Sequence, residues 1–431
     1  MWRALSLFLI VGAGGLVNAR ADDPKVWLQG ELPRLLPLYQ HLHAHPELSL
    51  QERETAARIA RELKELGIEV TTGVGGHGVV GVLKNGNGPR LLIRTDMDAL
   101  PVVEQTGLPY ASKVKTADPA GDGQVGVMHA CGHDIHMTNF VGVARYLASH
   151  RDAWKGTVLF VAQPAEEKGL GARAMLKDGL YQRFGKPNYA IALHVASNLP
   201  AGVIGYRSGY ALANVDSCDI TVFGRGGHGA FPHTTVDPIV QAAQLVLALQ
   251  TIVAREVDPV ESAVISVGSI HAGTKHNIIP DRCHLQATIR SYSPKVREQL
   301  KEAIVRKAEG IAASMGAPKP KVEFSEGLPA VYNDPALVDR VVPALQRALG
   351  QNRVMAVPPV MGAEDFALYR TDDVPIFMFW LGSVAPKRLK AMEAPVSLHS
   401  PFYYPDPEPT LRAGITAMTA AALKLLSGKS D

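Results

Sequence analysis

Residues 127–136 concentrate side chains that bind metals: three histidines, one cysteine and one aspartate lie within ten positions. Imidazole and thiolate are the preferred ligands of zinc and similar ions, and carboxylates complete such sites. Gly132 lets the chain turn sharply in the middle of the segment. Tracts of this kind favour metal binding over a polar loop with incidental histidines. Further ligands, and a base if the site is catalytic, must come from other parts of the chain.

Polar side chains also follow a series of apolar segments with the length and composition of strands. These groups are Asp96 with Asp98, the segment 127–136, Glu166 with Glu167, and His194 after a strand predicted over 189–193. Open α/β sheets place their sites at the carboxyl ends of strands, so these groups point to one shared site. Adjacent carboxylates cannot face the same point, and we interpret the Glu166–Glu167 pair as one metal ligand and one general base.

Alternating strands and helices, including a helix predicted over 138–149, indicate an α/β fold with a mixed, largely parallel sheet flanked by helices. From residue 214 to residue 324 the order becomes strand, helix, two strands, helix, strand. This order is ferredoxin-like, and about 110 residues suffice for an inserted α+β domain. We therefore predict four segments: a signal peptide at 1–21, a catalytic domain at 22–213, an inserted domain at 214–326, and the rest of the catalytic domain at 327–431.

The N-terminal segment has the composition of a signal peptide. Arg3 supplies a positive charge, residues 4–17 form an apolar run, and small residues allow cleavage after Ala19 or Ala21. The run is short for a membrane span. We expect a secreted or periplasmic protein with no stable membrane insertion after cleavage. The alternative is an uncleaved membrane anchor.

Composition limits the other classes of function. The net charge of +3 over 431 residues gives no reason to expect a basic face, so we predict no nucleic-acid partner. Three cysteines do not form a disulfide framework. On neighbouring antiparallel strands Cys218 and Cys283 would lie near opposite ends of the sheet, so we expect both to be buried and unbridged.

Nine motifs and their order carry a family resemblance, and two of them are the short segments LH (193–194) and IRS (289–291). The other seven are DMDALP (96–101), HACGHD (129–134), QPAEE (163–167), GGHGAFPH (226–233), NIIP (277–280), MGAEDF (361–366) and LHSP (398–401). With them the sequence resembles the di-metal aminoacylase and carboxypeptidase family, metallopeptidase family twenty. Within it, the chain resembles the amidohydrolase branch, which includes hippurate hydrolase and auxin–amino acid conjugate hydrolase. The resemblance covers nearly the whole chain after the predicted signal peptide.

The resemblance implies a centre for two divalent metal ions. Five residues match the family's ligands: Cys131, His133, Glu167, His194 and His399. Glu166 matches the general base that activates the metal-bound water, and Asp98 matches a group that orients a ligand. The thiolate favours zinc, whereas histidine and carboxylate ligands also suit manganese, cobalt or nickel. The sequence assigns no role to Asp96.

For the inserted domain, the resemblance implies a lid and dimerisation function. His228 matches a histidine that stabilises the tetrahedral oxyanion, often across a dimer interface. Asn277 and Arg290 match residues that hold the carboxylate of the substrate, which a guanidinium binds with two parallel hydrogen bonds. Because these residues lie on a separate domain, catalysis would require domain closure. We expect a homodimer or a higher homo-oligomer.

These features together predict a metal-dependent amidohydrolase. Its substrate would be a small molecule, an N-acyl or N-aroyl amino acid such as hippurate, cleaved at the amide bond. A carboxypeptidase or dipeptidase on the same di-metal site is the alternative enzyme. An inactive metal-binding scaffold is a third hypothesis, which the intact Glu166 beside a full ligand set disfavours.

Overall fold

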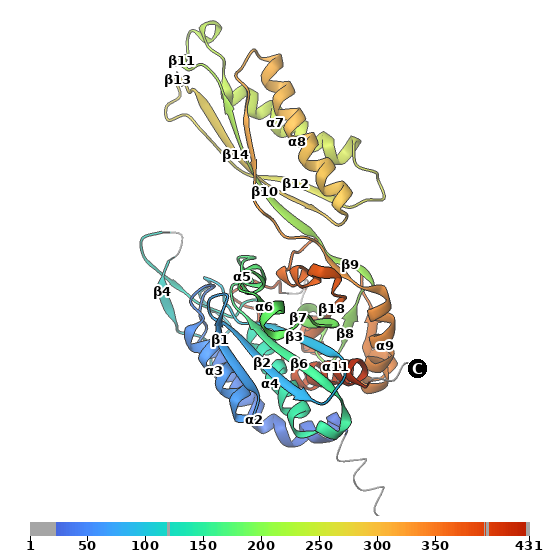
Figure 1. The fold of residues 1–431 in the computed structure, drawn as a ribbon. Coiled ribbons are helices and arrows are strands. Elements are labelled where there is room, and N and C mark those ends of the chain that lie inside the picture. The colour runs from blue at the N-terminus through green and yellow to red at the C-terminus, as the bar shows by residue number, and fades with distance from the viewer. Residues whose placement is uncertain (1–22, 119–120, 392, 394–395, 428–431) are drawn as a thin grey trace, which may run out of the picture.

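The computed structural model is built on two sheets (Figure 1). It describes residues 23–118, 121–391, 393 and 396–427, so the predicted signal peptide lies outside the described residues. An eight-stranded sheet forms the core of the main domain, and a four-stranded sheet belongs to a small domain that stands clear of it. The first strand of the small sheet begins at Asn214 and its last strand ends at Phe324.

The main sheet is mixed, with a parallel centre. Its strands, in spatial order, are β1 (Glu69–Val74), β2 (Gly78–Asn85), β6 (Gly156–Gln163), β3 (Arg90–Asp96), β7 (Tyr189–Pro200), β18 (Ile376–Val384), β8 (Ile204–Tyr206) and β17 (Val354–Ala356). The central pairs β6–β3, β3–β7 and β7–β18 are parallel, whereas β1–β2, β2–β6 and β18–β8 are antiparallel. The predicted fold class is therefore confirmed. The central strands are buried on both faces, which explains their nearly continuous apolar sequences.

Helices cover both faces of the main sheet. One face is covered by α2 (Pro24–Ala44), α3 (Arg53–Glu65), α4 (His133–Ser149), α9 (Pro335–Leu349) and α11 (Pro407–Leu426). The other face is covered by α5 (Gly171–Lys177), α6 (Leu180–Phe184) and η4 (Asp365–Asp373). Leu91 and Phe160 face the first group, while their neighbours Leu92 and Leu159 face the second. This alternation follows from the two-residue period of a strand.

Three long helices begin at a polar cap followed by proline. Asp237, Ser293 and Asp334 accept backbone N–H groups from the first turns of α7 (Pro238–Arg255), α8 (Pro294–Ser314) and α9. Such side chains satisfy N–H groups that have no partner within the helix. Proline suits the first position because its φ is already helical and it has no N–H to leave unpaired. These local signals explain where the three helices start.

The small domain has the ferredoxin-like order that its sequence predicts. Its antiparallel sheet has the order β12–β14–β10–β15, from β10 (Asn214–Phe223), β12 (Ala263–Ala272), β14 (Arg282–Ser291) and β15 (Lys321–Phe324). Helices α7 and α8 pack on the sheet through a core that contains Cys218 and Cys283. Cys218 lies opposite Ala287 and Cys283 lies opposite Val222. Both cysteines are buried and free.

The remaining described elements are short. They are β4 (Lys115–Ala117), β5 (Gln124–Gly126), β9 (Gly209–Leu212), β11 (Gly227–His228), β13 (Ile278–Ile279), β16 (Val331–Asn333), α10 (Pro386–Ala391), η1 (Arg151–Ala153), η2 (Pro232–Thr234) and η3 (Gln351–Arg353). β4 and β5 form a hairpin, β9 pairs with β16, and β11 pairs with β13 at the end of the small domain far from the main domain (Figure 1). One helix of the described chain, α7, is long and apolar enough to cross a membrane, and its buried side chains pack in the core of the small domain.

Two elements near the metal-binding segment differ from their predictions. Helix α4 starts at His133 rather than Thr138, because Gly132 adopts a left-handed φ of 77° that turns the chain into the helix. Strand β7 continues to Pro200 because β18 pairs with it along most of that length. His194 therefore lies within a strand rather than after one. Both differences bring a predicted ligand onto a regular element, which restricts its movement.

Candidate metal centre

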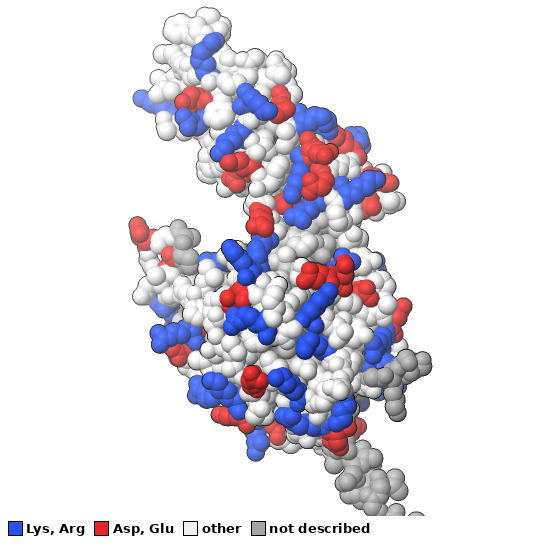
Figure 2. All heavy atoms as spheres, in the orientation of Figure 1, with Lys and Arg blue, Asp and Glu red and all other residues white. Residues whose placement is uncertain are grey.

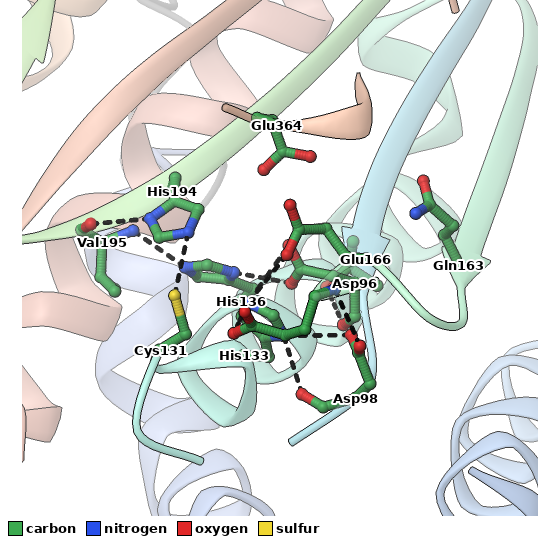
Figure 3. A network of polar contacts seen from close by, with 12 residues as sticks. Asp96, Asp98, Cys131, His133, His136, Gln163, Glu166, His194, Val195 and Glu364 are labelled. Carbon is green, nitrogen blue, oxygen red and sulfur yellow. Dashed lines mark hydrogen bonds and ion pairs between the residues drawn. The ribbon is translucent and has the colours of Figure 1, made fainter. Parts of the chain in front are cut away.

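The side chains predicted for the metal site converge near the carboxyl ends of the central strands. Figure 3 shows Asp98, Cys131, His133, Glu166 and His194 among them. Asp96 ends β3, the loop after β6 carries Glu166 and Glu167, and β7 carries His194. Because β6, β3 and β7 are adjacent and parallel, they bring these residues to one edge of the sheet. The turn that leads into α4 faces the same point with Cys131.

Two histidines of the centre are held so that their Nε2 atoms are free. His133 Nδ1 donates to the backbone carbonyl of Asp98 at 2.8 Å, and His194 Nδ1 donates to the carbonyl of Val195 at 2.8 Å. A carbonyl only accepts, so each Nδ1 carries the proton and each Nε2 offers a lone pair. Asp98 Oδ1 also lies 3.4 Å from His133 Nδ1. Such a second contact of the ring is characteristic of metal-binding histidines.

The Cys131 thiol lies between two groups of donor atoms. Its Sγ is 3.5 Å from His194 Nε2 and 3.3 Å from His399 Nε2. One group contains Cys131, His133 and His194, and the other contains Cys131, Glu167 and His399. Within each group the donor atoms lie within 4.8 Å of one another. The structure thus brings the five predicted ligands together in two groups that share the thiol.

This donor set fits divalent metal ions. His133 Nε2 and Glu167 Oε1 are buried, lie 3.8 Å apart and have no hydrogen-bond partner among the described residues. Burying such groups without a partner is costly, and a cation that both contact removes that cost. Thiolate, imidazole and carboxylate are also the ligand types of zinc and neighbouring transition metals.

Charges in the centre shift the pKa values of its members. Burial and the charge of Glu167 raise the pKa of the Cys131 thiol well above its usual range. Burial lowers the pKa of His133, but the carboxylates of Asp96 and Asp98 outweigh burial and raise it to about 10. A divalent ion favours the thiolate and the neutral imidazole, and therefore opposes both shifts.

Glu166 lies beside the ligand groups. Its Oε2 is 4.0 Å from His133 Nε2, and its carboxyl belongs to one donor group with His133 and Glu167 and to another with Glu364 and Asp365. Burial, followed by the charges of Glu364 and Asp365, raises the pKa of Glu166 well above its usual range. Figure 3 shows Glu166 between His133 and Glu364. A carboxyl with a raised pKa next to the metal ligands suits a base that accepts a proton and returns it.

A buried arginine organises the carboxylates behind the centre. Arg94 donates to Asp96 at 2.6 Å, to Glu364 at 2.8 Å, to Asp365 at 3.0 Å and to Gln163 at 3.1 Å. A guanidinium suits this place because it stays charged and has five N–H donors. Sequence reasoning missed this cluster. The signal was a charged residue inside the buried strand sequence RLLIRTD, where a charge needs partners.

Asp96 and His136 support this arrangement. His136 Nδ1 donates to Asp96 Oδ1 at 2.7 Å, and His136 Nε2 accepts the N–H of Val195 at 2.8 Å. Asp96, His133 and His136 have donor atoms close enough for a metal, but both ring nitrogens of His136 are already in use. Asp96, to which the sequence assigns no role, therefore holds His136 on one oxygen and Arg94 on the other.

His43 connects α2 to the start of α4. Its Nδ1 lies 2.6 Å from Asp134 Oδ2 and its Nε2 lies 3.0 Å from Glu104 Oε1. Burial lowers the pKa of His43, but the hydrogen bonds to Asp134 and Glu104 outweigh burial and raise it to about 9. A protonated His43 donates to both carboxylates, and so it holds Asp134 directly beside His133.

The structure does not bring the three predicted residues of the small domain to this centre. His228 in β11 and Asn277 before β13 are exposed at the end of the small domain far from the main domain (Figure 1). Arg290 is half-buried near the other end of β14, and the strand from Arg282 to Arg290 spans about 26 Å. His228 Nδ1 accepts the N–H of Ala230 at 3.0 Å, so its exposed Nε2 is a hydrogen-bond donor.

A comparison with protein families identifies the family of this chain. Residues 92–424 match the model of the peptidase family M20/M25/M40. The chain belongs to this family. The resemblance inferred from the motifs is confirmed, and the M20 chain is a metal-dependent hydrolase whose relatives include amidohydrolases and carboxypeptidases.

M20 members with different named activities are similar over most of this chain. An N-acetylcysteine deacetylase from Bacillus subtilis is 39% identical over 81% of this chain and 88% of its own length. A thermostable carboxypeptidase from Saccharolobus solfataricus is 38% identical, covering 82% and 87% of the two chains. The hippurate hydrolase of Campylobacter jejuni is 39% identical, covering 79% and 85%. The crystal structure of a dinuclear metal-binding M20 peptidase from Bacillus subtilis has a TM-score of 0.76 at 34% identity, covering 93% of this chain and 100% of that one.

Proposed function

We propose that this M20 enzyme hydrolyses the amide bond of N-acyl or N-aroyl amino acids, releasing a carboxylic acid and a free amino acid. The observation that carries the proposal is the position of Glu166 beside two groups of metal-binding atoms that share Cys131. A deacetylase of N-acetylcysteine and a hydrolase of hippurate are among its relatives, and both names describe substrates of this class.

The side chains divide the work of the reaction. Five ligands would hold two divalent ions, which would polarise the amide carbonyl and make water more acidic: Cys131, His133, Glu167, His194 and His399. Glu166 takes a proton from the attacking water at its carboxylate and passes it to the nitrogen of the leaving amino acid. Asp98 keeps His133 in the tautomer that leaves Nε2 free. Water is the nucleophile, so no covalent bond to a side chain forms.

The metal that we propose is zinc. Cys131 supplies a soft thiolate, which favours zinc over harder ions, while the histidines and Glu167 also suit manganese, cobalt or nickel. Elemental analysis of protein purified without added metal, followed by reloading with each ion, tests this choice.

We further propose that a homodimer completes the site. The two domains are separated on one side by an open notch (Figure 2), and Lys, Arg, Asp and Glu are interspersed over the visible face of both. Large apolar side chains of the small domain are exposed: Phe231, Ile239, Val240, Leu247, Ile270 and Ile278. Burial of such side chains between two copies is favourable. The partner copy would then carry its His228 toward the metal centre of the first copy, whose own His228 lies at the far end of the small domain.

Export is a separate proposal that rests on the sequence. The signal-like residues 1–21 support a secreted or periplasmic location. Mass spectrometry of the protein from culture medium or periplasm should find an N-terminus directly after Ala19 or Ala21. A full-length chain retained in the membrane fraction would contradict the proposal.

A carboxypeptidase or dipeptidase activity is the second candidate, which the similarity to a thermostable carboxypeptidase favours. The two activities differ in the group on the acyl side of the cleaved bond, which is a simple acyl group in an N-acyl amino acid and an amino acid residue in a peptide. A panel of N-benzoylglycine, N-acetyl amino acids and unblocked dipeptides separates them. We expect the acylated substrates to be cleaved with the higher kcat/KM.

Glu166→Gln tests the mechanism. Glutamine keeps the shape of the side chain but accepts no proton, so kcat with N-benzoylglycine should fall by about 10²–10⁴-fold while the metal content stays unchanged. Glu69→Gln, on an exposed strand, is the control and should behave like the wild type. Undiminished hydrolysis by Glu166→Gln would show that another group is the base. If the wild type cleaved no substrate of the panel with any metal, the hypothesis of an inactive metal-binding scaffold would replace the proposed activity.

A further inference from the structure

Residues 47–52 form a turn that is fastened to the chain beyond β3. Leu48 forms a parallel bridge with Ala99, and the N–H of Ala99 donates to the carbonyl of Glu47 at 2.8 Å. Leu50 has a positive φ of 70°, which a residue with a branched side chain rarely adopts. A conformation of this kind persists only where the surroundings hold it, so the turn has a defined shape.

Glu52 reaches from this turn to the loop that carries the base. Its Oε1 accepts the N–H of Ala165 at 2.7 Å, and both residues are fully buried. Ala165 has a φ of 51°, in the left-handed region that is unfavourable for any residue with a Cβ. The carbonyl of Ala165 accepts the N–H groups of Leu170 at 3.1 Å and Gly171 at 3.2 Å. Ala165 is thus held on both sides, and Glu52 supplies the only side chain among these contacts.

Ser49 acts on the same loop through Asp98. The Ser49 hydroxyl donates to Asp98 Oδ2 at 2.6 Å, and the same oxygen accepts the N–H of Glu167 at 3.0 Å. Ser49 and Asp98 are both buried. One turn therefore supports the peptide N–H before Glu166 directly and the peptide N–H after it through one carboxylate.

We propose that Ser49 and Glu52 are positioning residues that set the direction of Glu166 by supporting the peptide groups on either side of it. Glu166 and Glu167 both have an oxygen near His133, but only Glu166 also groups with Glu364 and Asp365, whereas Glu167 Oε2 lies 3.5 Å from His399 Nε2. This divergence depends on the backbone at Ala165. The proposal rests on the proposed function of Glu166 as the base.

The same turn offers a matched control. The Glu47 carboxylate accepts the N–H of Glu54 at 3.1 Å and the N–H of Thr55 at 2.7 Å, both in the first turn of α3. Its loss removes a helix contact from the same segment without touching the loop around Glu166. Glu47→Ala should therefore lower the unfolding temperature and leave kcat unchanged.

The test compares Glu52→Ala, Glu52→Gln, Ser49→Ala and Glu47→Ala, with N-benzoylglycine as the probe substrate. Glu52→Ala should lower kcat by about 10–100-fold with little change in KM, and under saturating metal it should keep the wild-type metal content. Glu52→Gln should recover most of the activity, because its amide oxygen accepts the Ala165 N–H in the same place. Burial raises the pKa of Glu52 to about 7, so a neutral side chain is a fair replacement. Ser49→Ala should weaken metal retention against a chelator, since it acts on the N–H of the ligand Glu167.

A second background separates positioning from general stability. Glycine adopts the left-handed region freely, so in Ala165→Gly the removal of Glu52 should cost less activity than it does in the wild type. Equal losses in both backgrounds would overturn the proposal. So would wild-type kcat in Glu52→Ala together with wild-type metal retention in Ser49→Ala. If Glu166→Gln is inactive while these variants are fully active, only the positioning fails. If Glu166→Gln is active, the assignment of the base fails first.

Discussion

The metal-binding region of the main domain and the far end of the small domain contribute residues to the same proposed reaction, but they are prepared to different degrees. In the main domain, Cys131, His133 and His194 are drawn together before any substrate binds, and His133 is completely buried. At the far end of the small domain, His228 and Asn277 are exposed on short segments. In the proposed reaction the metal centre is preorganised, and His228 and Asn277 would have to be brought to it.

The difference follows from how each region is built. Three adjacent parallel strands converge on the metal centre, and hydrogen bonds to the backbone carbonyls of Asp98 and Val195 fix the rings of His133 and His194. The far end of the small domain consists of a two-stranded pair and a short turn. A metal site has to stay assembled between turnovers, whereas a substrate needs an opening through which to enter. We therefore expect the metal centre to stay assembled throughout the reaction and the small domain to move.

Removing His228 should have the largest effect on the movable half. His228→Ala loses the donor proposed for the oxyanion, so kcat should fall by about 10²–10³-fold with unchanged metal content. His233→Ala, in the same motif and also exposed, is the matched control and should keep kcat. Equal effects of the two changes would contradict a specific role for His228.

Mixing two inactive variants tests whether a partner copy supplies His228. If a partner copy supplies His228, a hybrid of Glu166→Gln with His228→Ala has one complete site, because Glu166 and His228 then come from different chains. Activity should return when the two variants are unfolded, mixed and refolded together. If each chain closes on its own centre, the mixture stays inactive, and the dimer proposal is wrong.

The hydrogen bonds of His43, which support the metal centre, should make the free energy of unfolding depend on pH. The pKa of His43 is raised to about 9 in the folded protein, against about 6.5 when unfolded. Its contribution is therefore complete below about pH 6.5 and is lost as the pH rises toward 9. Relative to His43→Gln, the wild type should lose an advantage on the order of 3 kcal/mol across that interval.

Urea unfolding at a series of pH values, with saturating metal, measures this difference. The groups that face His43 are Asp134, Glu104, Tyr39 and Tyr110. Both tyrosines have raised pKa values, and both carboxylates have lowered ones, so His43 is the group expected to titrate in this window. A stability difference that stays constant from pH 6 to pH 9 would show that His43 is not charged in the folded protein.

The smallest expected effect concerns Arg290. If its guanidinium holds the carboxylate of the substrate, Arg290→Lys should raise KM by about 10–100-fold with a smaller change in kcat, because lysine keeps the charge but not the paired hydrogen bonds. Arg282→Lys, on the same strand and exposed, should leave KM unchanged. An unchanged KM in Arg290→Lys would show that another residue binds the carboxylate of the substrate.

Local patterns explain what the sequence could predict. The segments HACGHD and QPAEE place ligand types beside turns and strands, so their grouping depends on short stretches of chain. The order of strands and helices likewise predicts the topology of the small domain, because each element has its own apolar period and its own caps.

Contacts between residues far apart in the chain explain what the sequence could not predict. Arg94 and Glu364 are 270 positions apart, and Glu52 and Ala165 are 113 positions apart, so their contacts depend on the final packing of the sheet. The family resemblance indicates His133 rather than His136 as a ligand, but the physical reason is the N–H of Val195, which occupies His136 from a strand 59 positions later. Neither the type nor the spacing of these residues contains that information.

The most direct measurement is a crystal structure of the metal-loaded protein with anomalous scattering data that locate the ions. It should show two ions in contact with the five proposed ligands, which are Cys131, His133, Glu167, His194 and His399. Glu166 should lie beside the ions and coordinate neither of them. A single ion bound by Asp96, His133 and His136, with His136 released from Val195, would contradict the assignment of both the ligands and the base.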